Sequence, residues 1–347
     1  MKSSGRGTFL KNFFEKNESI GILGAGSWGT TLAWLLSKRH KVRVWEFDRK
    51  QLVKVIKERE NKKFLPHIKL SKKIIFSNDA PDVITRSNIV IIALPSHTIR
   101  ETVKKYSDLL KKKIMVNVSK GIENKTLKRI SEILYDETGN KQIYVLSGPS
   151  HAEEVARKIP TTVVLSSLNQ DKKRMKYLQG IFITEHFRVY TNPDIIGVEL
   201  CGSLKNIIAI AAGISDGIGF GSNTKAAIMT RGITEIRRLG MKLGAHTETF
   251  GGLAGIGDLI TTCISKYSRN RHVGEELGKG KNISSILKKM VMIAEGVKTT
   301  LSAYNLSKKH RVSMPITEEV YNIIYRNKNT KKAVQALMSR EPKPEIW

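Results

Sequence analysis

The feature that most constrains the fold is a glycine hexad, Gly24-x-Gly26-x-x-Gly29, between two short apolar segments. SIGILGA (19–25) has the β-branched composition of a buried strand, and WGTTLAWLLSKR (28–39) has the apolar spacing of a helix with one buried face. In a strand–turn–helix unit, the first glycine permits a tight turn, the second admits a pyrophosphate, and the third lets the helix pack on the strand. The helix N-terminus supplies N–H groups to the phosphates. This context favours a dinucleotide site over an ordinary glycine-rich turn.

Short apolar segments alternate with amphipathic ones to about residue 165, which is typical of a parallel sheet flanked by helices. The expected strands are 19–25, 41–46, 73–77, 88–94, 113–119, 142–148 and 161–167. After residue 195 helical patterns dominate, over 195–215, 223–242, 270–279, 284–309 and 315–326. The pattern therefore predicts a Rossmann-type, doubly wound α/β domain followed by an all-α domain.

The boundary is expected at the turn dipeptide Asn192-Pro193. A chain of 347 residues is long enough for two domains. The expected parts are a basic N-terminal tail (1–18), the dinucleotide-binding domain (19–192) and a helical substrate and catalytic domain (193–340).

The formal net charge of +29 raises the question of a nucleic acid or an anionic lipid as partner. Lysines are spread over the whole length without a nucleic-acid-binding signature, so we expect a solvated basic surface and no nucleic acid partner. The most apolar window, 195–214, contains Glu199, Lys205 and Asn206. These side chains are costly at a bilayer centre, so we expect a buried helix and no stable membrane insertion.

Residues 1–18 lack the apolar stretch of a secretory signal, which favours a cytoplasmic protein. The two cysteines, Cys201 and Cys263, cannot form a disulfide framework or a CxxC metal site. We therefore expect a reducing compartment and no metal.

Lys205 and Asn206 stand in the middle of the apolar stretch LCGSLKNIIAIAAG (200–213). A lysine there can extend to solvent, pair with a buried carboxylate such as Glu199, or serve as a functional ammonium. Apolar residues surround this helix on most sides and leave no broad polar face. This pattern favours the functional interpretation without excluding the other two.

Polar residues at three further places could bind an anionic substrate. They are Lys120 in VNVSKGIE, Asp258 and Thr262 in GLAGIGDLITTC, and Ser268, Arg269 and Asn270 in YSRNRHVG. A guanidinium and the N–H groups of a helix start would together bind a phosphate. Each feature also has an ordinary structural explanation: a strand-end lysine, a helix cap or a solvated helix start.

The end of the second predicted strand bears on the choice of cofactor. Glu46 would suit a ribose 2′-hydroxyl and NAD, whereas Arg49 and Lys50 could bind the 2′-phosphate of NADP. In ALPSHTIR, His97 lies at the sheet edge where ligands bind, although a histidine there is more often a packing or hydrogen-bonding residue.

Several stretches, in a common order, resemble the NAD(P)-dependent glycerol-3-phosphate dehydrogenases of the soluble, bacterial type: GAGSWGTTLA, LPSH, SKGIE, SGPSHAEEVA, NPDIIGVELCGSLKNIIAIAAG, GLAGIGDLITTC, SRNR and MPITEEVY. They extend from about residue 20 to 326. The resemblance implies the reversible reduction of dihydroxyacetone phosphate to sn-glycerol 3-phosphate with NADH or NADPH. The product would supply the glycerol backbone of phospholipids.

The resemblance also implies residue roles, with Lys205 as the catalytic acid and base. The implied substrate ligands are Lys120, Gly148, Ser150, Lys205, Asp258, Ser268, Arg269 and Asn270. The implied cofactor contacts are Gly24, Gly26, Ser27, Trp28, Gly29, Lys120, Ala152, Arg269, Ile293 and Glu295. Phe47 is neither the basic residue nor the histidine expected for a 2′-phosphate, so the preference between NAD and NADP stays open.

Hydride arriving at a ketone leaves negative charge on its oxygen, which a positioned ammonium would stabilise and protonate. An apolar helix would disfavour the charged form of Lys205 and strengthen its hydrogen bond to the carbonyl. We further expect Asn206 and Asp258 to orient the ammonium and Arg269 to hold the phosphate.

Two other functions fit parts of the sequence. One is a two-domain dehydrogenase for a hydroxy acid or 6-phosphogluconate, and the other is a basic nucleic-acid-binding protein on a dinucleotide-binding scaffold. A homodimer through the helical domain is a further expectation, although a long apolar helix can equally be buried within one chain.

Overall fold

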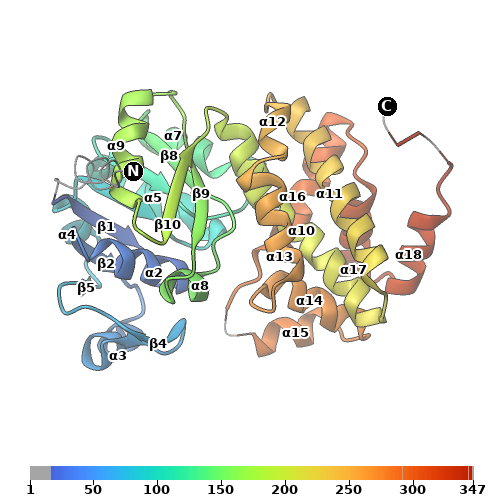
Figure 1. Ribbon diagram of the computed structural model, residues 1–347, viewed down its shortest axis with the longest axis horizontal. Helices are drawn as coiled ribbons and strands as arrows, with labels where there is room; N and C mark the ends of the chain where they lie inside the picture. The colour runs from blue at the N-terminus through green and yellow to red at the C-terminus, as the bar shows by residue number, and fades with distance from the viewer. Residues whose placement is uncertain (1–16, 291, 343, 346–347) are drawn as a thin grey trace, which may run out of the picture. The chain divides into compact units, whose positions relative to one another are not determined.

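The computed structural model describes residues 17–290, 292–342 and 344–345 (Figure 1). The chain forms two compact units: unit 1 comprises residues 1–120 and 128–199, and unit 2 comprises residues 121–127 and 200–347. The expected basic tail, 1–18, lies outside the described residues except for its last two positions.

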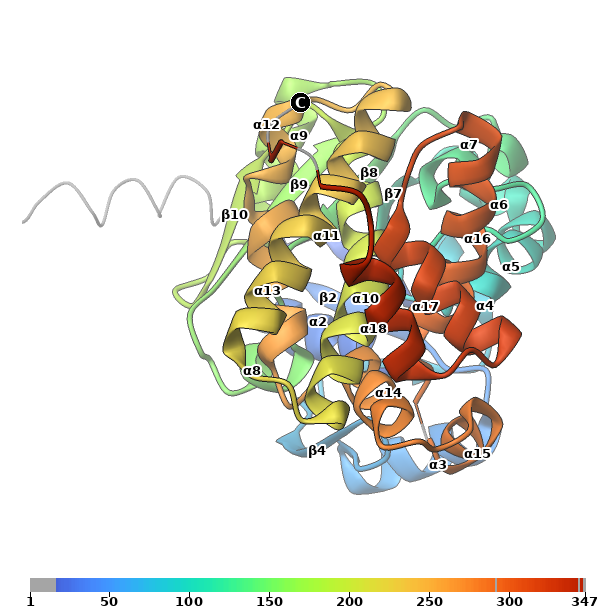
Figure 2. The same ribbon diagram turned by 90° about the vertical axis from the view of Figure 1, so that its right-hand side faces the viewer.

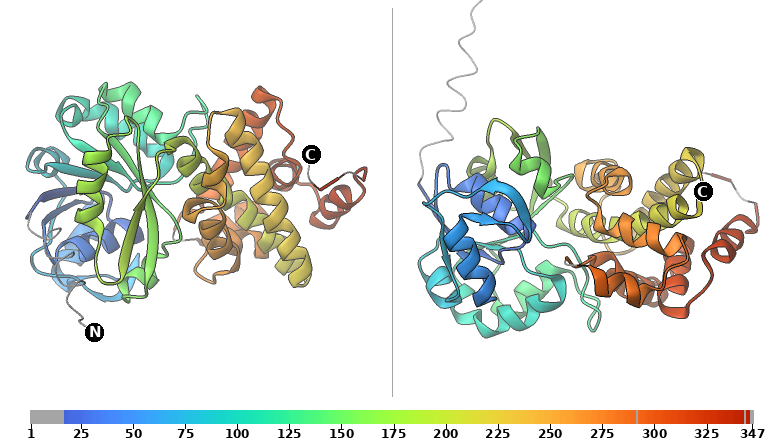
Figure 3. Two further views of the ribbon diagram at one scale, coloured as in Figure 1. Left: turned by 45° about the horizontal axis from the view of Figure 1, so that its top comes forward. Right: turned by 90° about the horizontal axis from the view of Figure 1, so that it is seen from below.

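Unit 1 is built on an eight-stranded sheet in the order β10-β9-β8-β7-β6-β1-β2-β5. Its strands are β1 (Ser19–Leu23), β2 (Lys41–Trp45), β5 (Ile75–Ser77), β6 (Ile89–Ile92), β7 (Ile114–Asn117), β8 (Ile143–Ser147), β9 (Thr161–Ser167) and β10 (Phe187–Thr191). Ile89 and Ile91 of β6 belong to one buried apolar cluster, while Val90 and Ile92 belong to another. Because side chains alternate along a strand, both faces of the sheet are covered, as a doubly wound fold requires. The sheet is strongly twisted (Figure 3).

The predicted strands are confirmed with slightly shorter ends, and β10 is an additional strand. Strands β3 (Glu60–Asn61) and β4 (Leu65–Lys69) form a separate small sheet. Strand β9 pairs antiparallel to β8, whereas the other pairs of the large sheet are parallel. The connecting helix, α8 (Ala152–Ala156), has only five residues and packs on α2, so the chain turns back without a long crossover.

The other helices of unit 1 are α2 (Ser27–Leu36), α3 (Arg49–Glu58), α4 (Ala80–Thr85), η1 (Ser96–Thr98), α5 (Ile99–Lys105), α6 (Ser107–Leu110), α7 (Ile130–Thr138) and α9 (Lys172–Phe182). Aspartates begin several of them. The Asp48 carboxylate accepts from the N–H groups of Lys50 and Gln51 at the start of α3, and Asp171 caps α9 in the same way.

Unit 2 consists of helices (Figure 2). They are α10 (Ile195–Ile218), whose first turn belongs to unit 1, α11 (Ser222–Lys242), α12 (Thr247–Phe250), η2 (Leu253–Gly257), α13 (Asp258–Ile264), α14 (Arg269–Gly278), α15 (Ile283–Lys289), α16 (Glu295–His310), α17 (Pro315–Arg326) and α18 (Thr330–Met338). The single helix predicted over 284–309 is thus wrong, because the backbone leaves the helical conformation at Met290 and a second helix begins at Glu295.

Helix α10 is the core of unit 2. Among the described helices it is the one long and apolar enough to cross a membrane, and 89% of its most apolar window is buried in the protein. Glycines bring α14 against it: a Cβ at Gly213 would lie 2.0 Å from the carbonyl oxygen of Arg271, and one at Gly274 would lie 2.0 Å from that of Ile210. This close approach sets the start of α14 beside the middle of α10.

Candidate active site

The three glycines of the hexad have three different surroundings in unit 1. Gly24 has a φ of 111°, a conformation that side chains rarely adopt, and a Cβ on Gly29 would lie 2.0 Å from the carbonyl oxygen of Gly24. At Gly26, by contrast, a Cβ would meet no protein atom within 4 Å. Helix α2 begins at the next residue, Ser27, so its first N–H groups lie beside this open space. The turn therefore fits a pyrophosphate group.

A buried asparagine holds this turn in place. Asn61 is fully buried, and its Nδ2 donates to the Ala25 carbonyl and to Thr30 Oγ1, both at 2.8 Å. Its Oδ1 accepts from Gln51 Nε2 at 2.8 Å. Sequence reasoning missed Asn61, because it lies in the two-residue strand β3 and is far from the hexad along the chain.

Glu46 follows β2 beside the glycine turn, since the Gly24 N–H donates to the Trp45 carbonyl. Its carboxylate is nearly buried and accepts from the Asp48 N–H at 2.9 Å, and burial raises the pKa of Glu46. Phe47 is 78% exposed and leaves this position open to solvent. The acidic side chain is thus the one directed into the protein at the end of β2.

The ends of β7 and β8 bring three predicted residues together. Lys120 Nζ donates to the Gly148 carbonyl at 3.2 Å, and Ser150 Oγ donates to the same oxygen at 3.0 Å. Gly148 has a φ of 138°.

His97 lies in η1 with an exposed side chain.

Ala152 and Trp28 also lie close together in unit 1. Trp28 packs against the buried cluster that contains Leu65 and Ala152, and Thr31 Oγ1 donates to the Ala152 carbonyl at 3.3 Å. Helix α8 is therefore attached to the helix that begins at the glycine turn.

In unit 2, Lys205 is buried in α10 with only 6% of its surface exposed. Its Nζ donates to the Asp258 carboxylate and, at 2.5 Å, to Thr262 Oγ1. The Thr262 hydroxyl in turn donates to the Asp258 carbonyl at 2.6 Å. Asp258 is 1% exposed, so the pair is an ion pair inside the protein. A carboxylate in contact favours the charged form of the ammonium and opposes the effect of burial.

This geometry bears on two of the three interpretations of Lys205. The side chain does not extend to solvent, and its carboxylate partner is Asp258 instead of Glu199. Glu199 accepts from Arg129 at 2.7 Å and from the Ser131 hydroxyl at 2.5 Å. Burial raises the pKa of Glu199, and the neighbouring Arg129 opposes that rise.

The glycine-rich turn η2 presents Asp258 to α10. A Cβ on Gly255 would lie 2.1 Å from the Phe250 carbonyl oxygen, so the turn packs too closely for any other residue. Asp258 is then the first residue of α13, where a carboxylate also stabilises the helix start.

Asn206 links helices of unit 2 through its side chain. Its Oδ1 accepts from Asn270 Nδ2 at 2.9 Å, and Asn270 Oδ1 accepts from the Gly296 N–H at 2.9 Å. The amide oxygen of Asn206 thus joins α10 to α14 and, through Asn270, to α16. The orienting role expected of Asn206 toward Lys205 stays a prediction.

The break between α15 and α16 gives Arg269 a partner. Its guanidinium is exposed and donates to the Ile293 carbonyl at 2.9 Å, a carbonyl that a continuous helix would have used itself. Glu295 is the first residue of α16. Ser268 is nearly buried, and its hydroxyl caps α14 by accepting from the Arg271 N–H at 3.2 Å.

The predicted site residues therefore form two groups, one in each unit. Unit 1 holds Gly24, Gly26, Ser27, Trp28, Gly29, Lys120, Gly148, Ser150 and Ala152. Unit 2 holds Lys205, Asp258, Ser268, Arg269, Asn270, Ile293 and Glu295. The first group is suited to a dinucleotide, and the second combines a buried ammonium with an exposed guanidinium at a helix start.

Known proteins match both groups. The family described as NAD-dependent glycerol-3-phosphate dehydrogenase matches with its N-terminal part over residues 19–192 and with its C-terminal part over residues 194–335. The glycerol-3-phosphate dehydrogenase [NAD(P)+] of Thermoanaerobacter sp. (strain X514) is 51% identical over 329 residues, which cover 94% of this chain and 98% of that protein. The enzyme of the same name from Chlorobium chlorochromatii is 49% identical over 332 residues, covering 94% and 99%.

A solved structure agrees with the sequence relatives. The glycerol-3-phosphate dehydrogenase of Coxiella burnetii has a TM-score of 0.89 and 38% identity, and the match covers 93% of this chain and 99% of that one. The order of motifs, the fold and these matches lead to one conclusion: the chain belongs to the NAD(P)-dependent glycerol-3-phosphate dehydrogenases.

Proposed function

We propose that Lys205 is the catalytic acid in the reaction of this enzyme, the reversible reduction of dihydroxyacetone phosphate to sn-glycerol 3-phosphate with NADH or NADPH. The observation that carries the assignment is the Lys205 ammonium buried in an apolar helix and in contact with the Asp258 carboxylate. Apolar residues of similar volume commonly stabilise a protein interior as well as a buried ion pair does, so packing alone does not explain a lysine at this position.

The dinucleotide is assigned to unit 1, with its pyrophosphate at Gly26 and the N-terminus of α2. The reduced nicotinamide, when bound, supplies the hydride. Ser27, Trp28 and Ala152 are proposed to line the nucleotide, with Lys120 in contact with both cofactor and substrate. Arg269, Ile293 and Glu295 of unit 2 are proposed as further nucleotide contacts.

Lys205 has two tasks in this mechanism. As the carbonyl carbon accepts the hydride, the oxygen gains negative charge that the ammonium stabilises in surroundings of low polarity. The proton then moves from Lys205 Nζ to that oxygen: the N–H bond breaks, the O–H bond forms and the lysine becomes a neutral amine. The Asp258 carboxylate keeps the lysine charged before the step and favours its reprotonation afterwards. In the reverse direction the amine is the base.

The phosphate of the substrate is assigned to the start of α14. Arg269 presents its guanidinium there, and the helix N-terminus adds N–H groups. The remaining proposed substrate ligands are Asp258, Ser268, Asn270, Gly148 and Ser150. The amide of Asn270 has a second hydrogen besides the one donated to Asn206.

The product is a backbone precursor of phospholipids, so the enzyme serves lipid synthesis. We place it in the cytoplasm, without nucleic acid partners and without stable membrane insertion, which the burial of α10 supports. A homodimer through unit 2 is proposed, and sedimentation of the purified protein would test it.

The test of the assignment follows the near-ultraviolet absorbance of NADH and NADPH with dihydroxyacetone phosphate as substrate and unphosphorylated dihydroxyacetone as control. Lys205→Met should lower kcat by about 10²- to 10⁴-fold while the Kd of the dinucleotide is unchanged. Lys242→Met removes an exposed lysine of the same unit and should behave as the native protein. The double variant Lys205→Met with Asp258→Asn avoids an unpaired buried carboxylate and must be equally inactive. Turnover near the native value in either Lys205 variant would reject the role.

A further inference from the structure

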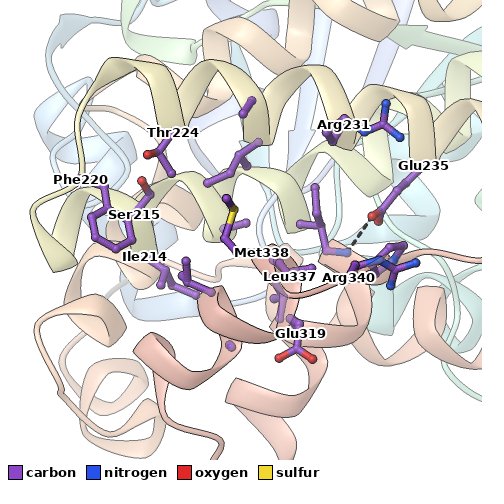
Figure 4. Close-up of a pocket in the computed structure, with 18 of the residues that line it drawn as sticks. Ile214, Ser215, Phe220, Thr224, Arg231, Glu235, Glu319, Leu337, Met338 and Arg340 are labelled. Carbon is purple, nitrogen blue, oxygen red and sulfur yellow. Dashed lines mark hydrogen bonds between the residues drawn. The ribbon is translucent and has the colours of Figure 1, made fainter. Parts of the chain in front are cut away.

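A cavity lies in unit 2, formed by α10, α11, α17, α18 and residues after α18 (Figure 4). Its volume is about 510 Å³, within the usual range of small-molecule sites. It shares no residue with the proposed active site. Most of the lining is apolar and includes Ala211, Ile214, Ile228, Val320, Val334 and Leu337.

The cavity is elongated. Its lining follows α11 from Thr224 to Arg238, a separation that corresponds to about 21 Å along a helix. Figure 4 shows Ser215, Phe220 and Thr224 toward one end and Arg231, Glu235 and Arg340 toward the other. The two ends therefore differ in chemistry.

One end carries three guanidinium groups, those of Arg231, Arg238 and Arg340. Burial lowers the pKa of Arg238, the Glu235 carboxylate raises it, and the like charges of Arg231, Arg340 and Arg237 lower it, so Arg238 is within electrostatic range of the other two lining arginines. Arg238 donates to the Ser313 carbonyl at 2.5 Å. For Arg231 and Arg340, the described part of the chain offers no ion-pair partner.

The carboxylates of the lining offset only part of the positive charge at this end, where Glu235 raises the pKa of Arg238. Glu235 accepts hydrogen bonds from the Ile316 and Thr317 N–H groups and from the Thr317 hydroxyl. Glu319 pairs with Lys328 at 2.7 Å. The remaining two, Glu341 and Glu345, follow α18 and are exposed. An anionic group would relieve the repulsion among the arginines.

The other end contains a buried hydroxyl. Ser215 is 2% exposed, and its Oγ has no hydrogen-bond partner among the described residues. A hydroxyl that is buried without a partner costs free energy, so a ligand atom that forms a hydrogen bond there would be favoured.

We propose that this cavity binds an elongated amphiphile with an anionic group at the arginine end, a hydrocarbon body and a hydroxyl or carbonyl at the Ser215 end. An ω-hydroxy fatty acid anion has this chemistry. Helix α18 lines the cavity with Val334, Leu337 and Met338 but does not fill it, and Met338 remains 80% exposed. A purely apolar occupant would leave Arg231 and Arg340 without an ion-pair partner and the Ser215 hydroxyl without a hydrogen bond.

The experiment titrates the purified full-length protein with 12-hydroxydodecanoate, dodecanoate and decanoate below their micellar concentrations, by calorimetry. Dodecanoate should bind more tightly than decanoate by about fourfold per methylene. The ω-hydroxyl should add about fivefold, and Ser215→Ala should remove that difference. Arg231→Gln and Arg340→Gln should each weaken binding about tenfold. Arg237→Gln removes an exposed arginine of the same helix outside the lining and is the matched control, which should weaken binding far less than the two lining variants.

Three results would overturn the proposal. The first is equal binding of dodecyltrimethylammonium, since that would mean adsorption without charge selection. The second is equal weakening by all three arginine variants. The third is that the native protein binds none of the three fatty acids and forms a dimer that the Leu337→Asp substitution dissociates. That result would assign the cavity to a second copy of the chain.

Discussion

Substituting Asp258 by asparagine tests whether Lys205 is held as a charged group inside unit 2. The change keeps the shape of the side chain but leaves the Lys205 ammonium without its carboxylate, at a site where both residues are almost fully buried. Breaking a buried ion pair from one side costs about 3–5 kcal/mol. The lysine can escape this cost by losing its proton.

The free energy needed to remove the lysine proton sets an upper bound on the stability that Asp258→Asn loses, and this bound depends on pH. An ordinary lysine has a pKa near 10.4, so neutralising it costs about 4.6 kcal/mol at pH 7 and about 1.9 kcal/mol at pH 9. Asp258→Asn should therefore lower the free energy of unfolding by about 3–5 kcal/mol at pH 7 and by no more than about 2 kcal/mol at pH 9. The destabilisation shrinks as pH rises because the unpaired group prefers to be neutral.

Urea unfolding followed by two probes measures this effect. Helix content by far-ultraviolet circular dichroism reports strongly on unit 2, whereas the described tryptophans, Trp28, Trp34 and Trp45, all lie in unit 1. The circular dichroism transition should move to lower urea in Asp258→Asn while the fluorescence transition of the folded sheet changes less. A loss below about 1 kcal/mol at pH 7, or an equal loss at pH 7 and pH 9, would refute a charged, buried Lys205.

Other predictions concern the glycine turn and Glu235, which lines the cavity beside α18. Gly26→Ala should leave the unfolding of unit 1 within about 0.5 kcal/mol of the native value and yet weaken dinucleotide binding, because its Cβ meets only the space assigned to the pyrophosphate. Gly29→Ala places a Cβ 2.0 Å from the Gly24 carbonyl oxygen and should lower the free energy of unfolding by about 1–3 kcal/mol. Unfolding followed by tryptophan fluorescence, together with dinucleotide titration, should therefore separate the two variants. Identical behaviour of the two would contradict the assignment of the pyrophosphate to Gly26. Burial raises the pKa of Glu235 from 4.5 to about 7, so the folded state binds a proton that the unfolded chain has lost, and stability should fall by about 3 kcal/mol between pH 4.5 and pH 7. Glu235→Gln should remove this pH-dependent component, and an unchanged slope of unfolding free energy against pH would show that Glu235 is not its source.

The sequence predicts the sheet, the glycine turn and the burial of α10, because each depends on local periodicity or on a spacing with a single geometric cause. It does not predict that β9 is antiparallel, since the pattern of a buried strand is the same in both directions. The break between α15 and α16 also escapes periodicity, because it depends on what lies outside those helices: the Ile293 carbonyl is used by Arg269.

The same limit separates the site residues that sequence reasoning identified from those it missed. Lys205 is conspicuous because a charge interrupts an apolar pattern, and the expected contact of its ammonium with Asp258 is present although 53 residues separate the two. What the sequence leaves open is the choice between Asp258 and Glu199 as the carboxylate partner. Asn61 has no such signal, since a buried amide in a short strand resembles any polar loop residue. The cavity beside α18 depends on the distance between this amphipathic helix and its neighbours. The apolar periodicity of α18 does not predict that distance.

The buried pair also shows why stability alone cannot explain α10. Two apolar residues of similar size would commonly stabilise a protein interior as well as an ion pair or better, because they avoid the desolvation of two charges. The native sequence instead keeps Lys205 and Asp258 and adds Thr262 to accept a further N–H. A Lys205→Met, Asp258→Leu variant should therefore be at least as stable as the native protein in unit 2 and inactive in the reductase assay. That combination is expected only if the charge is retained for catalysis, and a marked loss of stability would show that the pair is structural.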